Sequence, residues 1–286
     1  MKRRHIFWHT LIVVSGFILL SSCQRSQPPD QPQDSPRQAA VAVPADLQDT
    51  INQFVHAVEN FDILHILDAY AEDFRSGSGR SKEDIHRIFT QLRSRNVKLK
   101  IEKAVIENTQ DKSASLRTQI RLRYPDSFRN LGEGEVVITD VLQHALRKNE
   151  AGWKIYTDDR VSTYREGRFG PRSPNAQLDV PSQLPTNSEY TVTVTVRREQ
   201  DVDYQVMVGN YAEDQTILPP PDFVTPLPDS GVLQTQLLPN PQGRGEMVRI
   251  TIIAGDREGQ WLGATTISKF VPGTSHQQEA GQQKRT

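Results

Sequence analysis

The spacing of the apolar residues changes once in the first half of this chain, near Asn96. Before that point, apolar residues recur at helical spacing in three segments, which begin near Leu47, Asp62 and Ser81. After it, apolar and polar residues alternate, as in the run Val97-Lys98-Leu99-Lys100-Ile101. Helical spacing predicts amphipathic helices, and alternation predicts strands with one buried face. We therefore expect three helices followed by a sheet in this part of the chain.

The second and third predicted helices carry local start signals. Asp62 is placed to cap the second helix, and the turn Ser76-Gly77-Ser78-Gly79 ends it. The third helix is expected to begin at Ser81, and Asp84 follows three residues later in a capping-box pattern.

Four strands are predicted after the helices. They cover residues 97–102, 116–123, 134–147 and 153–159, and the residues 149–152 predict a hairpin turn between the last two. Such a series forms an antiparallel meander. Because only one face of each strand is apolar, the helices are expected to cover one side of the sheet.

The order of these elements resembles the NTF2-like (SnoaL-like) superfamily over residues 46–166. The similar segments are FVHAVENFDILHILDAYAEDF, the capped third helix and GWKIYTDDR. The resemblance implies an α+β cone, in which a curved antiparallel sheet wraps around a long first helix and leaves a pocket. It also implies a sheet through which two copies form a homodimer. Some members of the superfamily are isomerases, dehydratases or hydrolases that use an Asp or His in the pocket as a general base.

The second half of the chain has an all-β pattern. Strand-like runs occur at 189–198, 204–208, 232–238, 247–254 and 261–270, and the proline-rich stretch 218–228 excludes a central strand. Short strands at this spacing predict an all-β sandwich over residues 175–272. The pattern resembles immunoglobulin-like modules, although the chain has no cysteine pair. Residues 167–174, GRFGPRSP, are expected to form the linker between the two domains.

The N-terminus has the features of a secretory signal. Lys2, Arg3 and Arg4 precede an apolar run that is shorter than the about 20 residues of a membrane span. Leu20-Ser21-Ser22-Cys23 resembles the lipobox of bacterial lipoproteins. The resemblance implies a signal peptide at 1–22 and acylation of Cys23, for example with palmitate. An ordinary cleaved signal with an incidental cysteine and an uncleaved anchor helix are the alternatives.

Two flanking segments are expected to be disordered. Residues 23–45 are rich in Pro, Gln and Ser and predict a tether, and residues 273–286 predict a polar tail. Gln24 follows Cys23, at the position where lipoproteins retained in the inner membrane carry Asp. The absence of Asp at this position resembles an outer-membrane sorting signal. We therefore expect a location in the cell envelope, on the outer membrane facing the periplasm if the organism is a diderm.

The charge of the chain argues against nucleic acid as a partner. The formal net charge is −1, and residues 175–272 hold six Lys and Arg against twelve Asp and Glu. Such a balance gives no general attraction to nucleic acid or anionic lipid. The membrane is expected to be contacted through the N-terminal lipid alone.

Three residues of the second helix region are candidates for a pocket. Asp73 is the candidate general base that the family resemblance implies, because members carry an acid near the end of this helix and burial raises a carboxyl pKa. The alternative is that Asp73 caps a turn or pairs with Arg75 or Arg80. Tyr70 is a pocket hydrogen-bond donor or a core residue, and His65 is a pocket residue or a packed, half-exposed histidine.

No metal or cofactor is predicted. The histidines do not have the spacing of metal ligands, and the chain contains no GxSxG, P-loop or GxGxxG motif. Asp201-Val202-Asp203 is compatible with calcium, but two carboxylates in a loop favour a solvated turn.

Basic residues recur with a period of two on the first two predicted strands. They are Lys98 and Lys100 on one strand and Arg117, Arg121 and Arg123 on the other. If the strands pair, these residues form a positive stripe on the outer face of the sheet. The stripe is a docking surface for an acidic partner or a solvated face with Glu102 and Glu107 as counter-charges, and the second interpretation is favoured.

These observations favour a membrane-anchored, non-enzymatic module that binds or scaffolds an envelope protein or a small ligand. The alternative is a pocket enzyme of isomerase, dehydratase or hydrolase type that acts on a small hydrophobic molecule through Asp73. An open cavity with Asp73 inside it favours the enzyme. A filled cavity favours the scaffold.

Overall fold

The computed structural model describes residues 43–128, 132–186, 188–212, 223–239 and 245–273. The predicted signal peptide, Cys23, nearly all of the tether and the tail from residue 274 lie outside these ranges. All described residues belong to one compact unit, Val41–Thr286. In the described ranges, no helix has the length and apolar character that crossing a membrane requires.

Three helices open the described chain, as the spacing predicts. They are α1 (Ala45–Glu59), α2 (Ile63–Ala69) and α3 (Lys82–Ser94). The Asp62 carboxylate accepts a hydrogen bond from the His65 backbone N–H at 3.3 Å and caps α2. Ser81 and Asp84 form the predicted capping box at the start of α3. These caps satisfy backbone N–H groups that have no partner within their own helix.

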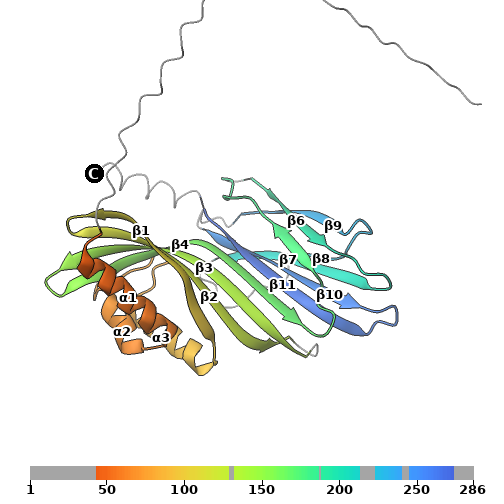
Figure 1. Ribbon diagram of the computed structural model, residues 1–286. Coiled ribbons are helices and arrows are strands. Elements are labelled where there is room, and N and C mark those ends of the chain that lie inside the picture. The colour runs from red at the N-terminus through yellow and green to blue at the C-terminus, as the bar shows by residue number, and fades with distance from the viewer. Residues whose placement is uncertain (1–42, 129–131, 187, 213–222, 240–244, 274–286) are drawn as a thin grey trace, which may run out of the picture. The chain divides into compact units, whose positions relative to one another are not determined.

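Four long strands follow and pair in sequence order. They are β1 (Lys98–Gln110), β2 (Ser113–Ser127), β3 (Glu133–Asn149) and β4 (Gly152–Phe169), and every pairing is antiparallel. Figure 1 shows the three helices on one side of this sheet. Buried residues of the helices and of the inner sheet face form one hydrophobic cluster around Phe54, Phe74 and Trp153. The described elements therefore confirm the α+β class.

Strand β4 extends beyond the predicted end of the first domain. Its last residues, Gly167 to Phe169, were expected in the linker, yet they pair with β3 on one side and with β11 (Trp261–Val271) on the other. One sheet of eight strands results, in the order β1-β2-β3-β4-β11-β10-β7-β8, and Figure 1 shows β4 beside β11. The segment Gly170 to Pro174 lies between β4 and β5 (Ala176–Asp179).

The glycine that suggested a linker has a packing role. A side chain at Gly167 would place its Cβ 2.7 Å from the Thr266 hydroxyl and 2.8 Å from the Phe169 ring. Contacts that short exclude a larger residue without a shift of the neighbours. Gly167 therefore allows β4 and β11 to approach each other.

The second region is built from strands in two sheets. Strands β7 (Asp203–Ala212), β8 (Phe223–Pro226) and β10 (Glu246–Gly255) continue the large sheet, while β5, β6 (Tyr190–Val196) and β9 (Val232–Leu237) form a three-stranded sheet. Buried residues from both sheets, including Val194, Val206 and Ile250, form one hydrophobic cluster. The proline-containing β8 is an edge strand, consistent with the exclusion of a central strand there.

Candidate functional site

A cavity lies between the helices and the inner face of the first four strands. Its volume is about 130 Å³. Most of its lining is apolar and comes from α1, α3 and the strands: Phe54, Val58, Ile85, Ile88, Phe89, Leu92, Leu99, Ile120, Leu122 and Leu142. Gly77 and the following polar side chains contribute the rest of the lining: Tyr70, Ser78, Arg80, Asp140, His144, Asp158, Asp159 and Arg160. The cavity thus combines an apolar wall with groups that can hydrogen-bond.

His144 is the most buried polar residue of this lining. It is 1% exposed, and its Nε2 lies 2.8 Å from the Thr118 hydroxyl. Its Nδ1 is buried without a hydrogen-bond partner in the described structure. Burial lowers the pKa of His144 to about 4, so the imidazole is neutral at pH 7. When Nε2 donates to Thr118, Nδ1 is an acceptor without a donor, and an unsatisfied buried acceptor of this kind is uncommon.

Two carboxylates lie near His144 on the same sheet face. Asp158 on β4 is the direct register partner of His144 on β3. Side chains at directly opposed positions have Cβ atoms about 5 Å apart. Asp140 lies four residues before His144 on β3 and accepts a hydrogen bond from the Thr163 hydroxyl at 2.6 Å. Carboxylates only accept hydrogen bonds when ionised, so this part of the lining favours a ligand that donates.

Tyr70 is held at the cavity by the segment after α2. This segment forms a parallel bridge from Tyr70 to Ile155, and the Ala71 N–H donates to the Ile155 carbonyl at 2.9 Å. The Tyr70 ring packs edge-on against Phe54 and Phe74, with centroids 6.1 Å and 4.7 Å apart. Burial, followed by the charge of Asp158, raises the pKa of Tyr70 well above its ordinary value. Its phenol is therefore a neutral group at physiological pH.

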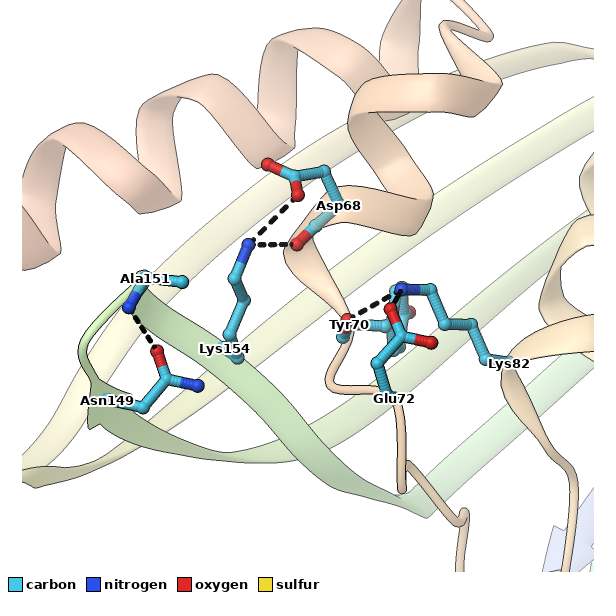
Figure 2. A network of polar contacts seen from close by, with 7 residues as sticks. All are labelled: Asp68, Tyr70, Glu72, Lys82, Asn149, Ala151 and Lys154. Atoms are coloured by element: carbon cyan, nitrogen blue, oxygen red, sulfur yellow. Dashed lines mark hydrogen bonds and ion pairs between the residues drawn. The ribbon is translucent and has the colours of Figure 1, made fainter.

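Two lysines fix the backbone on either side of Tyr70 (Figure 2). Lys154 Nζ donates to the Asp68 carbonyl at 2.5 Å and to its carboxylate at 3.0 Å. Lys82 Nζ donates to the Tyr70 carbonyl at 3.1 Å and to the Glu72 carboxylate at 2.8 Å. Helix α3 and strand β4 thus both position the segment that carries Tyr70.

The structure brings one of the three candidate pocket residues to the cavity. Tyr70 lines it, whereas Asp73 is exposed and does not. The Phe74 N–H donates to the Ala71 carbonyl at 3.1 Å, so Asp73 lies in a tight turn that directs the chain back to the core. His65 is also exposed, with its Nδ1 2.7 Å from the Asp62 carboxylate.

Sequence reasoning missed His144, Asp140 and Asp158. The sequence of β3 does contain a sign of this site. His144 and Asp140 stand at even positions together with the apolar residues Ile138, Leu142 and Leu146, so all five side chains project from the inner face of the strand. A polar residue among inward-facing apolar residues either has its hydrogen bonds satisfied within the core or is part of a functional site.

The basic residues of the first two strands form the expected row on the outer face. Lys98 is the register partner of Arg123 and Lys100 is that of Arg121, and all are exposed. Acidic neighbours offset the arginines: Arg117 pairs with Glu107 at 3.5 Å, Arg121 with Glu102 at 3.3 Å and Arg123 with Glu135 at 3.4 Å. The favoured interpretation, a solvated face with counter-charges, agrees with these contacts.

Potential metal ligands do not cluster within the described ranges. No group of three or more His, Cys, Asp or Glu side chains there is arranged to hold an ion. In the loop that was considered for calcium, Asp201 forms an ion pair with Arg257 at 2.5 Å.

Comparison with known proteins gives partial structural matches. No protein-family model matches the chain, and no curated protein matches it by sequence. An NTF2-like protein with a cystatin-like fold from Novosphingobium aromaticivorans is 12% identical, with a TM-score of 0.31, over 40% of this chain and 78% of its own. A cystatin-like-fold protein of unknown function from Nostoc punctiforme is 14% identical, with a TM-score of 0.30, over 40% and 86%. Bd1075 from Bdellovibrio bacteriovorus is 19% identical, with a TM-score of 0.33, over 40% of each chain.

Proposed function

We propose that this protein is a lipid-anchored envelope module whose cavity binds a small, mostly apolar molecule carrying one hydrogen-bond donor. The observation that carries the proposal is the buried, neutral His144, whose Nδ1 has no partner in the described structure while its ring lines an apolar cavity. In the tautomer whose Nε2 donates to Thr118, a bound donor supplies the missing hydrogen bond to Nδ1. The non-enzymatic role is supported by Asp73, the acid on which the enzyme alternative rested, because it is exposed and outside the lining.

The size of the cavity limits the ligand to about one ring. A dry protein cavity of about 150 Å³ accepts benzene. The cavity here is about 130 Å³, so a monocyclic compound with one hydroxyl or amine group is the class that it accommodates. Phenol is a suitable probe, and toluene, which has the same number of non-hydrogen atoms, is its matched apolar control.

The probe experiment is an NMR titration of the protein with phenol and, separately, with toluene. We expect saturable binding of both, and a phenol-to-toluene affinity ratio that falls about tenfold in His144→Leu, because that variant removes one buried hydrogen bond. His65→Leu, at an exposed histidine, is the control and should keep the wild-type ratio. An unchanged ratio in His144→Leu would show that His144 does not recognise the donor.

A second candidate function is proton-transfer catalysis in the same cavity. It is favoured by the register of Asp158 opposite His144, with both side chains in the lining. A neutral histidine next to a carboxylate can accept a proton from a bound substrate. Turnover of a bound compound that Asp158→Asn abolishes, without loss of phenol binding, would replace the binding proposal with this one.

We also propose the domain assignments that the sequence predicted. Three helices followed by an antiparallel sheet support an NTF2-like domain at 46–166, and the two packed sheets support an immunoglobulin-like sandwich at 175–272. In this assignment, strands of the two domains belong to one sheet through the β4–β11 pairing. The partner is an envelope protein or a second copy that associates through the β1–β3 face, and nucleic acid is not a partner.

The anchor is proposed from Cys23, the only cysteine of the chain. When the full chain is expressed in a diderm bacterium with radiolabelled palmitate, we expect label in the protein and recovery in the outer-membrane fraction. Cys23→Ser should abolish the labelling and release the protein to the soluble periplasmic fraction. Equal labelling or equal membrane recovery of Cys23→Ser would contradict the anchor.

A further inference from the structure

Three polar residues form a row across neighbouring strands where the two regions join. Arg165 on β4 is the register partner of Ser268 on β11, and Ser268 is the partner of Arg249 on β10. Direct partners in a sheet project from the same face, so both guanidinium groups lie on the side of Ser268. Neither arginine lines the cavity described above.

Within the described ranges, neither Arg165 nor Arg249 forms an ion pair with a carboxylate. Arg165 Nη2 donates to the Tyr124 hydroxyl at 3.0 Å, which is a neutral partner. Both side chains are partly buried, and Ser268 between them is only 3% exposed. Like charges placed together in a partly buried position are unfavourable unless an anion compensates them.

The electrostatics of Arg249 agree with this arrangement. Burial lowers the pKa of Arg249, and the neighbouring charge of Arg165 lowers it as well, while the Tyr211 phenol raises it. The groups that influence Arg249 therefore include a second cation and a phenol, with no carboxylate among them.

The surroundings of the row supply donors and space. The next residue beyond Arg249 is Gly209 on β7, which adds no side chain. The adjacent row on the same face contains the hydroxyls of Thr266 and Thr251, which are register partners. Hydroxyl and guanidinium donors are the groups that bind oxyanions in proteins, and arginine forks bind them in a bidentate manner.

We infer that Arg165, Ser268 and Arg249 form a binding site for a phosphate-type oxyanion at the junction of β4, β11 and β10. Strands are about 4.8 Å apart, so the two arginine Cα atoms are separated by about 10 Å. Side chains of that length can both reach one tetrahedral anion above Ser268, with Arg165 turning from the Tyr124 hydroxyl, its partner on β2, towards the anion. The site depends on the shared sheet, because each region supplies one of the arginines.

The phosphate belongs to a free phosphomonoester or to a phospholipid headgroup. Glycerol 1-phosphate and dihexanoyl phosphatidic acid, a soluble short-chain lipid, present the same headgroup chemistry and distinguish these sources. Similar affinities assign the site to free phosphomonoesters. At least tenfold tighter binding of the lipid assigns it to headgroups. Both results support an oxyanion site.

The test is a titration of the full mature protein with inorganic phosphate at constant ionic strength, measured by calorimetry. We expect one saturable site, with affinity at least tenfold weaker in Arg165→Gln and in Arg249→Gln. Arg168→Gln is the matched control, since Arg168 lies three residues along the same strand on the opposite face and pairs with Glu166 at 2.5 Å. This control should change the affinity less than twofold.

A stability measurement keeps the test decisive if a variant folds poorly. Without phosphate, Arg249→Gln should be at least as stable as the wild type, because it removes a repelled charge. The inference is overturned if no saturable phosphate binding occurs or if Arg168→Gln weakens it equally. A clear loss of stability in phosphate-free Arg249→Gln would also overturn it, because the guanidinium would then have a structural partner.

Discussion

Acidification from pH 7 to pH 4 is expected to destabilise the wild-type protein by about 3 kcal/mol more than it destabilises His144→Leu. The folded-state pKa of His144 is about 4, and burial is the cause. An unfolded histidine has a pKa of about 6.5. Between these values the unfolded state binds the proton and the folded state does not. The contribution is therefore complete above pH 6.5 and is lost as the pH falls towards 4.

Urea unfolding at pH 7 and pH 4 measures this difference for each protein. Carboxylates titrate in both proteins, so the comparison between wild type and His144→Leu isolates position 144. His65→Leu, which removes an exposed imidazole, controls for the loss of one histidine. If wild type and His144→Leu lose the same stability, the imidazole is solvated or accepts the proton without cost, and the lowered pKa of His144 is wrong.

Leu142→Trp is expected to abolish phenol binding, with the affinity lowered at least tenfold. Leu142 lines the cavity between Asp140 and His144 on the inward phase of β3. An indole at this position occupies the volume that the ligand needs. Overpacking costs about 1–3 kcal/mol of stability, which a folded domain generally tolerates. The measurement is the same NMR titration, with the dispersion of the spectrum as the check on folding.

Val141→Trp is the matched control for this variant. Val141 precedes Leu142 on the same strand and projects from the opposite face, where it does not line the cavity. It adds the same kind of side chain without filling the site, so phenol binding should be kept. Retained binding in Leu142→Trp, or equal loss in Val141→Trp, would place the phenol site elsewhere.

The helices and the first strands could be predicted because local chemistry defines their ends. Asp62 and Ser81 cap the two helices that they were expected to cap, and the period of two locates β1 and β2. These signals depend on neighbouring residues, so they are visible in the sequence.

The end of β4 could not be predicted, because its alternation is interrupted. Register shifts between Val141 and Leu142 and between Ala145 and Leu146 place extra residues on β4. After each shift, the residues of β4 that point inward change from odd to even positions or back. The inner face therefore carries Arg160 and Arg165, opposite Leu142 and Ile138, where apolar residues would be expected. The pairing with β11 joins residues about a hundred positions apart, and no local pattern encodes it.

The candidate site was predicted only in part, for a similar reason. Tyr70 follows the α2 helix and belongs to an apolar segment, so its place in the lining was visible. His144 can be recognised as a lining residue only when it is known which side chains of β3 point inward. That depends on how β3 pairs with β2 and β4. Asp73 had the residue type that the resemblance called for, but the turn from Ala71 to Phe74 turns it to solvent.

The central claim is that a small molecule occupies the cavity next to His144. Its most direct test is the detection of nuclear Overhauser effects between phenol ring protons and protein methyl groups at saturating phenol. We predict contacts to the methyl groups of Ile85, Ile120 and Leu142, which line the cavity from α3, β2 and β3. Contacts only to methyl groups outside the lining, or none at saturation, would contradict the claim.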